Sequence, residues 1–181
     1  MTARRASTLR RRRRSGGNAL VESAFTLLPT FALIFAFLDF GLMLFRWSTL
    51  QNAVREGVRY AITFQTQTDE TGVNLGQDAS IANVVQQYAM GMVTTTDDPQ
   101  HIFVKYYTQT NPYTPVGTGG NLPGNIVEVS IQNISFGWMA PLSGSYGGGL
   151  PFFRDSSPLT LSVYASDIMG GFPAGVTSVP E

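Results

Sequence analysis

Residues 24–45 read AFTLLPTFALIFAFLDFGLMLF, a stretch of 22 residues in which Asp39 is the single charged side chain. Thirteen of the 22 residues are Leu, Ile or Phe. As an α-helix the stretch is roughly 33 Å long, which is enough to cross a hydrocarbon layer of roughly 30 Å. A core helix of a soluble protein is apolar on one side, whereas this stretch is apolar all round. The sequence therefore predicts a membrane-spanning helix, with a buried core helix as the alternative.

A cleaved secretory signal fits this stretch less well. Its apolar run exceeds the usual length of about 7–15 residues. No small-x-small cleavage pattern follows Phe45, where the chain continues RWSTLQNAVREG. Pro29 lies inside the run and removes one helix hydrogen bond, so we expect a kink that a membrane helix tolerates. An uncleaved anchor is the better interpretation.

The charges of the chain are divided unevenly. Lys+Arg and Asp+Glu each number 12, but residues 1–17 hold seven arginines and no acid. Residues 18–181 hold five basic residues against all 12 acids, a charge of −7. Because basic residues stay on the cytoplasmic side of a membrane span, we expect a single-pass membrane protein. Its N-terminus is then cytoplasmic, and its C-terminal domain is exported.

The arginine run Arg10–Arg14 lies close to the predicted span. Anionic lipid headgroups attract each such residue by about 1 kcal/mol near the membrane surface. Nucleic acid is the alternative partner, because arginines also bind phosphates in a salt-dependent manner. The run has no interleaved aromatic residues. We therefore expect membrane lipid as the partner of this arm and no nucleic acid.

The composition excludes several classes of catalytic site. The chain has no cysteine and one histidine, His101, so thiolate chemistry and paired imidazole ligands are excluded. Asp97 and Asp98 precede a proline and are typical of a turn, and no calcium-loop spacing follows them. No glycine-rich phosphate motif is present. We expect no enzymatic activity, no cofactor, no metal and no small-molecule substrate, with a hydrolase built on His101 as the remaining enzymatic alternative.

Beyond the predicted span the chain becomes amphipathic. Apolar residues recur every three to four positions, as on one face of a helix, at Trp47, Leu50, Val54, Gly57/Val58, Ala61 and Phe64. One continuous helix from about Ala19 to about Phe64 is the simplest interpretation. Its second half then needs a partner surface, and the C-terminal domain is the obvious candidate.

The remainder of the chain predicts a small α+β domain. Periodicity and turn residues indicate one short helix followed by three strands, over residues 78–90, 101–108, 126–136 and 159–169. Glycine, proline and polar residues indicate loops over residues 65–77, 111–124 and 143–158. The predicted architecture is a long N-terminal helix packed on an antiparallel sheet of about three strands. Open sheet edges would allow another subunit to add a strand.

Four segments follow from these patterns. They are a basic arm over 1–17, a membrane helix over 18–46, an amphipathic continuation over 47–64, and an exported domain over 65–181.

Two blocks of the sequence resemble the TadE-like proteins of tight-adherence pilus systems. The first is GGNALVESAFTLLP, and the second is LQNAVREGVRYA after the apolar run. Together they cover about residues 16–61, a quarter of the chain. The second block is the more specific one, and its family positions include Leu50, Asn52, Ala53, Arg55, Glu56, Gly57, Arg59, Tyr60 and Ala61.

The resemblance implies a pseudopilin-like minor component of a pilus or secretion apparatus in the bacterial cytoplasmic (inner) membrane, with a periplasmic or extracytoplasmic C-terminal domain. The predicted α+β architecture is reminiscent of pilins. In well-studied members a prepilin peptidase cuts after a glycine, which corresponds here to a cut between Gly17 and Asn18 and makes Glu22 the fifth mature residue. The implied partners are other TadE-, TadF- or TadG-like pseudopilins, pilus platform proteins and a prepilin peptidase. The alternative is an anchored, exported ligand- or protein-binding domain that does not enter a filament.

Glu22 has two physical interpretations. A carboxylate at the edge of a membrane span needs a counter-charge or a proton, and the new amine on Asn18 of a neighbouring subunit would supply the charge. Such a pair would favour helices packed side by side. Alternatively, Glu22 is an acid near a helix N-terminus, stabilised by the helix dipole among headgroups.

Overall fold

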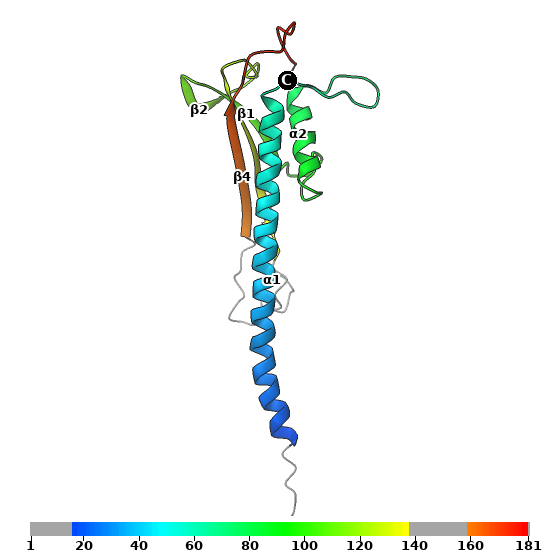
Figure 1. Ribbon diagram of the computed structural model, residues 1–181, viewed down its shortest axis with the longest axis vertical. Helices are drawn as coiled ribbons and strands as arrows, with labels where there is room; N and C mark the ends of the chain where they lie inside the picture. Colours follow the sequence, from blue (N-terminus) through cyan, green and yellow to red (C-terminus); the bar gives the residue numbers. More distant parts are fainter. Residues whose placement is uncertain (1–15, 138–158, 181) are drawn as a thin grey trace, which may run out of the picture.

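A computed structural model describes residues 16–137 and 159–180 of the chain (Figure 1). The predicted loop over 143–158 and nearly all of the basic arm lie outside these residues. The described elements are, in order, α1 (Gly16–Ala61), α2 (Gln77–Tyr88), β1 (Ile102–Thr108), β2 (Asn111–Val116), β3 (Ile126–Phe136) and β4 (Leu159–Ile168). The fold is α+β, as predicted.

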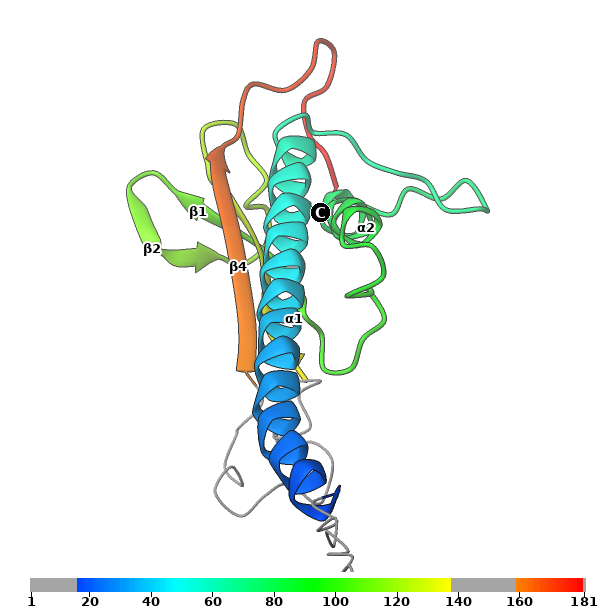
Figure 2. The same cartoon turned by 60° about the horizontal axis from the view of Figure 1, so that its bottom comes forward.

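Helix α1 runs unbroken for 46 residues, with Pro29 inside it. At about 1.5 Å per residue it is roughly 69 Å long. The predicted end at Phe64 is three residues too late, because Phe64 has a φ of 54° and the chain turns after Ala61. The C-terminal half of α1 lies between α2 and the strands (Figure 2).

The four described strands form one antiparallel sheet in the order β2-β1-β3-β4. Strands β3 and β4 pair from Ile126 with Ile168 to Phe136 with Leu159. The prediction of three strands was wrong by one, because residues 111–116 form a strand and not part of a loop. Strand β2 contains Pro112 and Pro115, and it occupies a sheet edge, where proline is tolerated.

The core lies between the helices and one face of the sheet. The predicted apolar stripe of α1 is buried there at Leu50, Val54 and Ala61, whereas Trp47 remains 48 % exposed and lies outside the stripe. The rest of the core comes mainly from alternate strand positions and one face of α2, namely Ile81, Val85, Ile102, Tyr106, Val127, Val129, Ile131 and Val163.

The chain after β4 folds back over the end of α1 (red in Figure 2). Met169 is buried, and the ring of Phe172 lies 4.6 Å from that of Phe64. Further along, the backbone N–H of Gln77 donates a hydrogen bond of 2.8 Å to the carbonyl oxygen of Pro180. The segment after β4 therefore packs against the chain at the end of α1 and bonds to the start of α2.

Candidate functional site

The N-terminal half of α1 presents large apolar side chains on all sides. Leu20, Phe25 and Phe37 are 74 %, 79 % and 69 % exposed. The most apolar 18-residue window of the helix has a mean hydropathy of 2.1, and 6 % of it is buried. A core helix would be covered, so this exposed surface supports a membrane-anchored protein. Asp39 lies within the apolar run but is 1 % exposed, so its carboxyl group does not face outward.

Small and polar side chains line one face of α1 near its start. Ala19, Glu22, Ser23 and Thr26 leave a shallow hollow of about 440 Å³ beside Leu27. The Ser23 hydroxyl donates to the Ala19 carbonyl over 2.7 Å, and the Thr26 hydroxyl donates to the Glu22 carbonyl over 3.1 Å. Because both hydroxyls bond to their own helix, this face allows another helix to approach closely.

The predicted processing position lies at the start of α1. Gly17 is exposed, and a side chain added there would meet nothing within 4 Å. Glu22 is also exposed, a little more than one helical turn further on. The structure thus places both residues on the free N-terminal part of the helix.

The second family block divides into a buried half and an exposed half. The buried half contains a row of small residues four positions apart, Ala53, Gly57 and Ala61. A Cβ atom at Gly57 would lie 2.5 Å from Cγ2 of Val85 in α2 and 3.4 Å from Cγ1 of Val129 in β3. The row is therefore small because α1 passes closely between α2 and the sheet.

The exposed half of the block consists of Asn52, Arg55 and Arg59. The Arg59 guanidinium contacts the Glu56 carboxylate at 3.2 Å, a surface ion pair of little stabilising value. Tyr60 is partly buried, and desolvation raises the pKa of its phenol. Packing explains the small residues of the block, but nothing within the described part of the chain explains the two arginines.

A buried polar cluster at the end of α1 was not predicted from the sequence. The Gln77 side chain is 0 % exposed, and its amide nitrogen donates to the Ala61 carbonyl over 2.8 Å. The amide nitrogen of Asn121 donates to the Gln77 side-chain oxygen over 3.0 Å and to the Val179 carbonyl over 2.9 Å. Gln77 and Asn121 lie 44 residues apart, in polar stretches that resemble ordinary loops, so no local signal marks them.

The residues considered for catalysis have structural roles here. Nδ1 of His101 lies 2.8 Å from the carbonyl oxygen of Gln132 on the neighbouring strand. The Asp97 carboxylate accepts hydrogen bonds from the backbone and hydroxyl of Thr94, which lower the pKa of Asp97. Asp97 is thus a turn former, as predicted. Within residues 16–137 and 159–180, no group of three or more His, Asp or Glu residues could hold a metal ion.

Comparison with known proteins gives a match over most of the long helix α1. The family model described as TadE-like protein matches residues 17–59, which are 43 of the 181 residues. No curated protein and no solved structure matches the chain. The matched segment contains the polar face around Glu22, the exposed apolar surface and most of the second block. Over these residues the chain carries a TadE-like segment, which confirms the sequence resemblance and indicates an involvement in tight-adherence pilus assembly.

Proposed function

We propose that this protein is a pseudopilin-like component of a tight-adherence pilus assembly or secretion apparatus, and that it acts by packing its helix against those of other subunits. The span lies in the inner membrane with the basic arm in the cytoplasm, and the sheet domain is periplasmic. The partners are TadE-, TadF- or TadG-like subunits or a pilus platform protein. The alternative is an anchored exported domain that binds its partner without entering a filament.

The observation that carries this proposal is the division of α1 into two halves. The C-terminal half is buried by its own domain, with Leu50, Ala53 and Val54 at most 1 % exposed. The N-terminal half leaves Leu20, Phe25 and Leu28 at least 73 % exposed. A helix built in this way holds a folded domain at one end and offers a bare apolar surface to lipid and to other helices at the other.

Glu22 is the residue that we propose to direct this packing. It lies on the face where Ala19, Ser23 and Thr26 allow close approach. A prepilin peptidase that cuts between Gly17 and Asn18 removes the +7 arm and exposes an amine near the same depth. The Glu22 carboxylate of one subunit then pairs with the Asn18 amine of its neighbour, which removes two unpaired charges from the membrane edge.

Glu22→Gln is expected to reduce co-purification with the other pseudopilins of a host that carries this pilus system by at least about tenfold, the factor that corresponds to roughly 1.4 kcal/mol. The substitution keeps the side-chain size and removes the charge. The measurement is quantitative immunoprecipitation of the detergent-solubilised full chain. The intact mass of the purified parent chain shows in the same preparation whether residues 1–17 have been removed.

Leu20→Ala is the matched control. Leu20 is 74 % exposed and lies about 160° around the helix from Glu22, so the change removes apolar surface from another face. Retained co-purification of this variant, with loss for Glu22→Gln, supports the proposal. Equal co-purification of Glu22→Gln and parent chain contradicts it and favours the alternative.

A further inference from the structure

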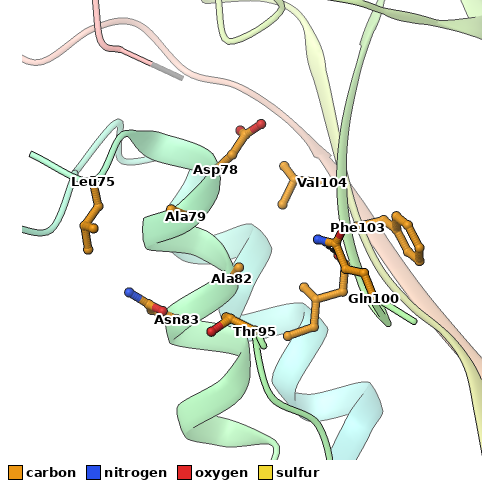
Figure 3. A pocket seen from close by; sticks show the side chains of 10 residues that line it. Leu75, Asp78, Ala79, Ala82, Asn83, Thr95, Gln100, Phe103 and Val104 are labelled. Atoms are coloured by element: carbon orange, nitrogen blue, oxygen red, sulfur yellow. Dashed lines mark hydrogen bonds between the residues drawn. The ribbon is translucent and has the colours of Figure 1, made fainter. Parts of the chain in front are cut away.

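A groove of about 580 Å³ lies between α2 and β1, on the exported domain (Figure 3). Ala79 and Ala82 line it from the α2 side, and Ile102 and Val104 line it from the β1 side. Thr95 and Gln100 are further lining residues, from the segment that precedes β1. The small alanines leave the room in which a side chain from another polypeptide would fit.

The β1 side of this groove is an open strand edge. Strand β2 pairs with β1 only at Tyr106 and Thr108. The preceding residues, Ile102–Lys105, pair with β3 on one side and with no described strand on the other. The groove therefore begins where the pairing with β2 stops.

The backbone of Val104 points toward this open side. The Gln132 N–H donates to the His101 carbonyl, so odd-numbered residues of β1 direct their backbone groups at β3. Even-numbered residues then direct theirs away from β3, in agreement with the pairing of Tyr106 and Thr108 with β2. At Ile102 the outward carbonyl accepts a hydrogen bond of 2.9 Å from the Gln100 side chain. At Val104 the outward N–H and C=O meet no described strand.

At the opposite edge of the sheet, a side chain of α1 bonds to an outward backbone group. The same alternation directs the carbonyl of Tyr164 in β4 away from β3, and this oxygen accepts a hydrogen bond of 3.2 Å from the Gln51 side chain of α1. Helix α1 thus occupies a backbone acceptor on the outer edge of β4. The edge of β1 at Val104 has no such cover, and open strand edges are sites at which another chain adds a strand.

We propose that an extended segment of a partner polypeptide binds in this groove as an added strand beside Ile102–Lys105. About four residues fit along that edge, which is roughly 13 Å long. Backbone hydrogen bonds to Val104 hold the segment, and an apolar side chain enters the space beside Ala79 and Ala82. Asp78 is the one charged residue that lines the groove, so a neutral or basic segment binds better than an acidic one. This inference does not depend on the pilus assignment.

The test uses a defined peptide, the acetylated and amidated Lys-Thr-Val-Thr-Val-Thr-Lys, added to the full chain in detergent micelles. Amide hydrogen exchange is followed by NMR. We expect saturating peptide to slow exchange of the Val104 amide at least about tenfold, because that N–H gains a partner. Replacing the second valine of the peptide by proline removes a backbone donor. Replacing both lysines by glutamate reverses the charge of the peptide. Both changed peptides should protect Val104 less.

Two variants locate the binding on the protein. Ala82→Trp fills the groove and should abolish protection of Val104, whereas Gln87→Trp places the same side chain at an exposed position of α2 and should leave protection intact. Unchanged Val104 exchange at saturating peptide overturns the proposal. Equal protection by the proline peptide overturns it as well, and this second comparison needs no altered protein.

Discussion

Gly57→Val is expected to lower the free energy of unfolding of the α+β domain by roughly 3 kcal/mol, because the substitution disrupts the packing of the second sequence block. The Cβ atom alone would lie 2.5 Å from Val85 Cγ2, and Ile81 Cγ2 lies within 3.7 Å. Two further methyl groups have no space there, because α2 and the sheet close on the same point of α1. Thermal unfolding of the full chain in detergent, followed by near-UV circular dichroism, measures the change.

A methyl exchange tests whether this contact causes the loss. Gly57→Ala alone gains about 1 kcal/mol of helix propensity but meets Val85, whereas Val85→Ala alone leaves a cavity. In the double variant the new methyl group occupies part of the space that Val85 vacates. We expect the free energy of unfolding of the double variant to be at least about 1 kcal/mol higher than the value obtained by adding the two single effects. Additive effects would contradict the packing assigned to Gly57.

Gly41→Ala is the matched control for the glycine substitutions. Gly41 lies in the same helix, and an added Cβ would meet nothing within 4 Å. The unfolding temperature of the α+β domain should therefore remain within about 1 °C of the parent value, because the change is far from the domain core. A loss as large as that of Gly57→Val would show that helix composition, and not close packing, determines the effect.

Gln77→Leu is expected to lower the free energy of unfolding by roughly 2–4 kcal/mol, although leucine has a similar volume and is more apolar. The change removes one of the two donors of the Ala61 carbonyl, which keeps the Phe64 N–H, and leaves the Asn121 amide without one acceptor, in a place where the Gln77 side chain is 0 % exposed. The loss measures a buried polar cluster that joins α1, α2 and the C-terminal segment. Urea unfolding of the full chain in detergent provides the measurement.

Gln87→Leu distinguishes this cluster from a general effect of leucine on α2. Gln87 is exposed on the same helix, so we expect a change within about 0.5 kcal/mol. If Gln77→Leu proves as stable as Gln87→Leu, the cluster does not hold these segments together.

The parts of the fold that were predicted correctly are those with strong periodicity. Residues 126–136 alternate between apolar and polar side chains, and β3 has these bounds. The apolar stripe from Leu50 to Ala61 repeats at helical spacing and is buried as expected. In both cases one face of a single element carries the signal, so no knowledge of distant residues is needed.

The parts that were missed depend on contacts between distant residues. Strand β2 was taken for part of a loop, because its two prolines hide a strand that exists only by pairing with the end of β1. The cluster of Gln77 and Asn121 brings together residues from two polar stretches. The groove beside Val104 exists because the pairing of β1 with β2 stops at Tyr106, and no local pattern indicates where that pairing stops. The role of Gly57 needed the position of Val85.

The central claim is that one helix lies in lipid over its N-terminal half and holds an exported domain with its C-terminal half. The chain has no cysteine, so single cysteines can be introduced as unambiguous probes. Leu28→Cys and Phe37→Cys test the first half, and Asn52→Cys and Arg55→Cys test the second. All four positions are exposed in the structure, so a difference in their labelling reports the surrounding lipid and not burial within the protein.

Labelling of these four variants with a membrane-impermeant maleimide, in intact cells whose outer membrane has been made permeable, is the most direct measurement. We predict rapid labelling at positions 52 and 55, and labelling at positions 28 and 37 only after the membrane is dissolved in detergent. Labelling of Phe37→Cys in intact membranes at the rate of Asn52→Cys would contradict the account.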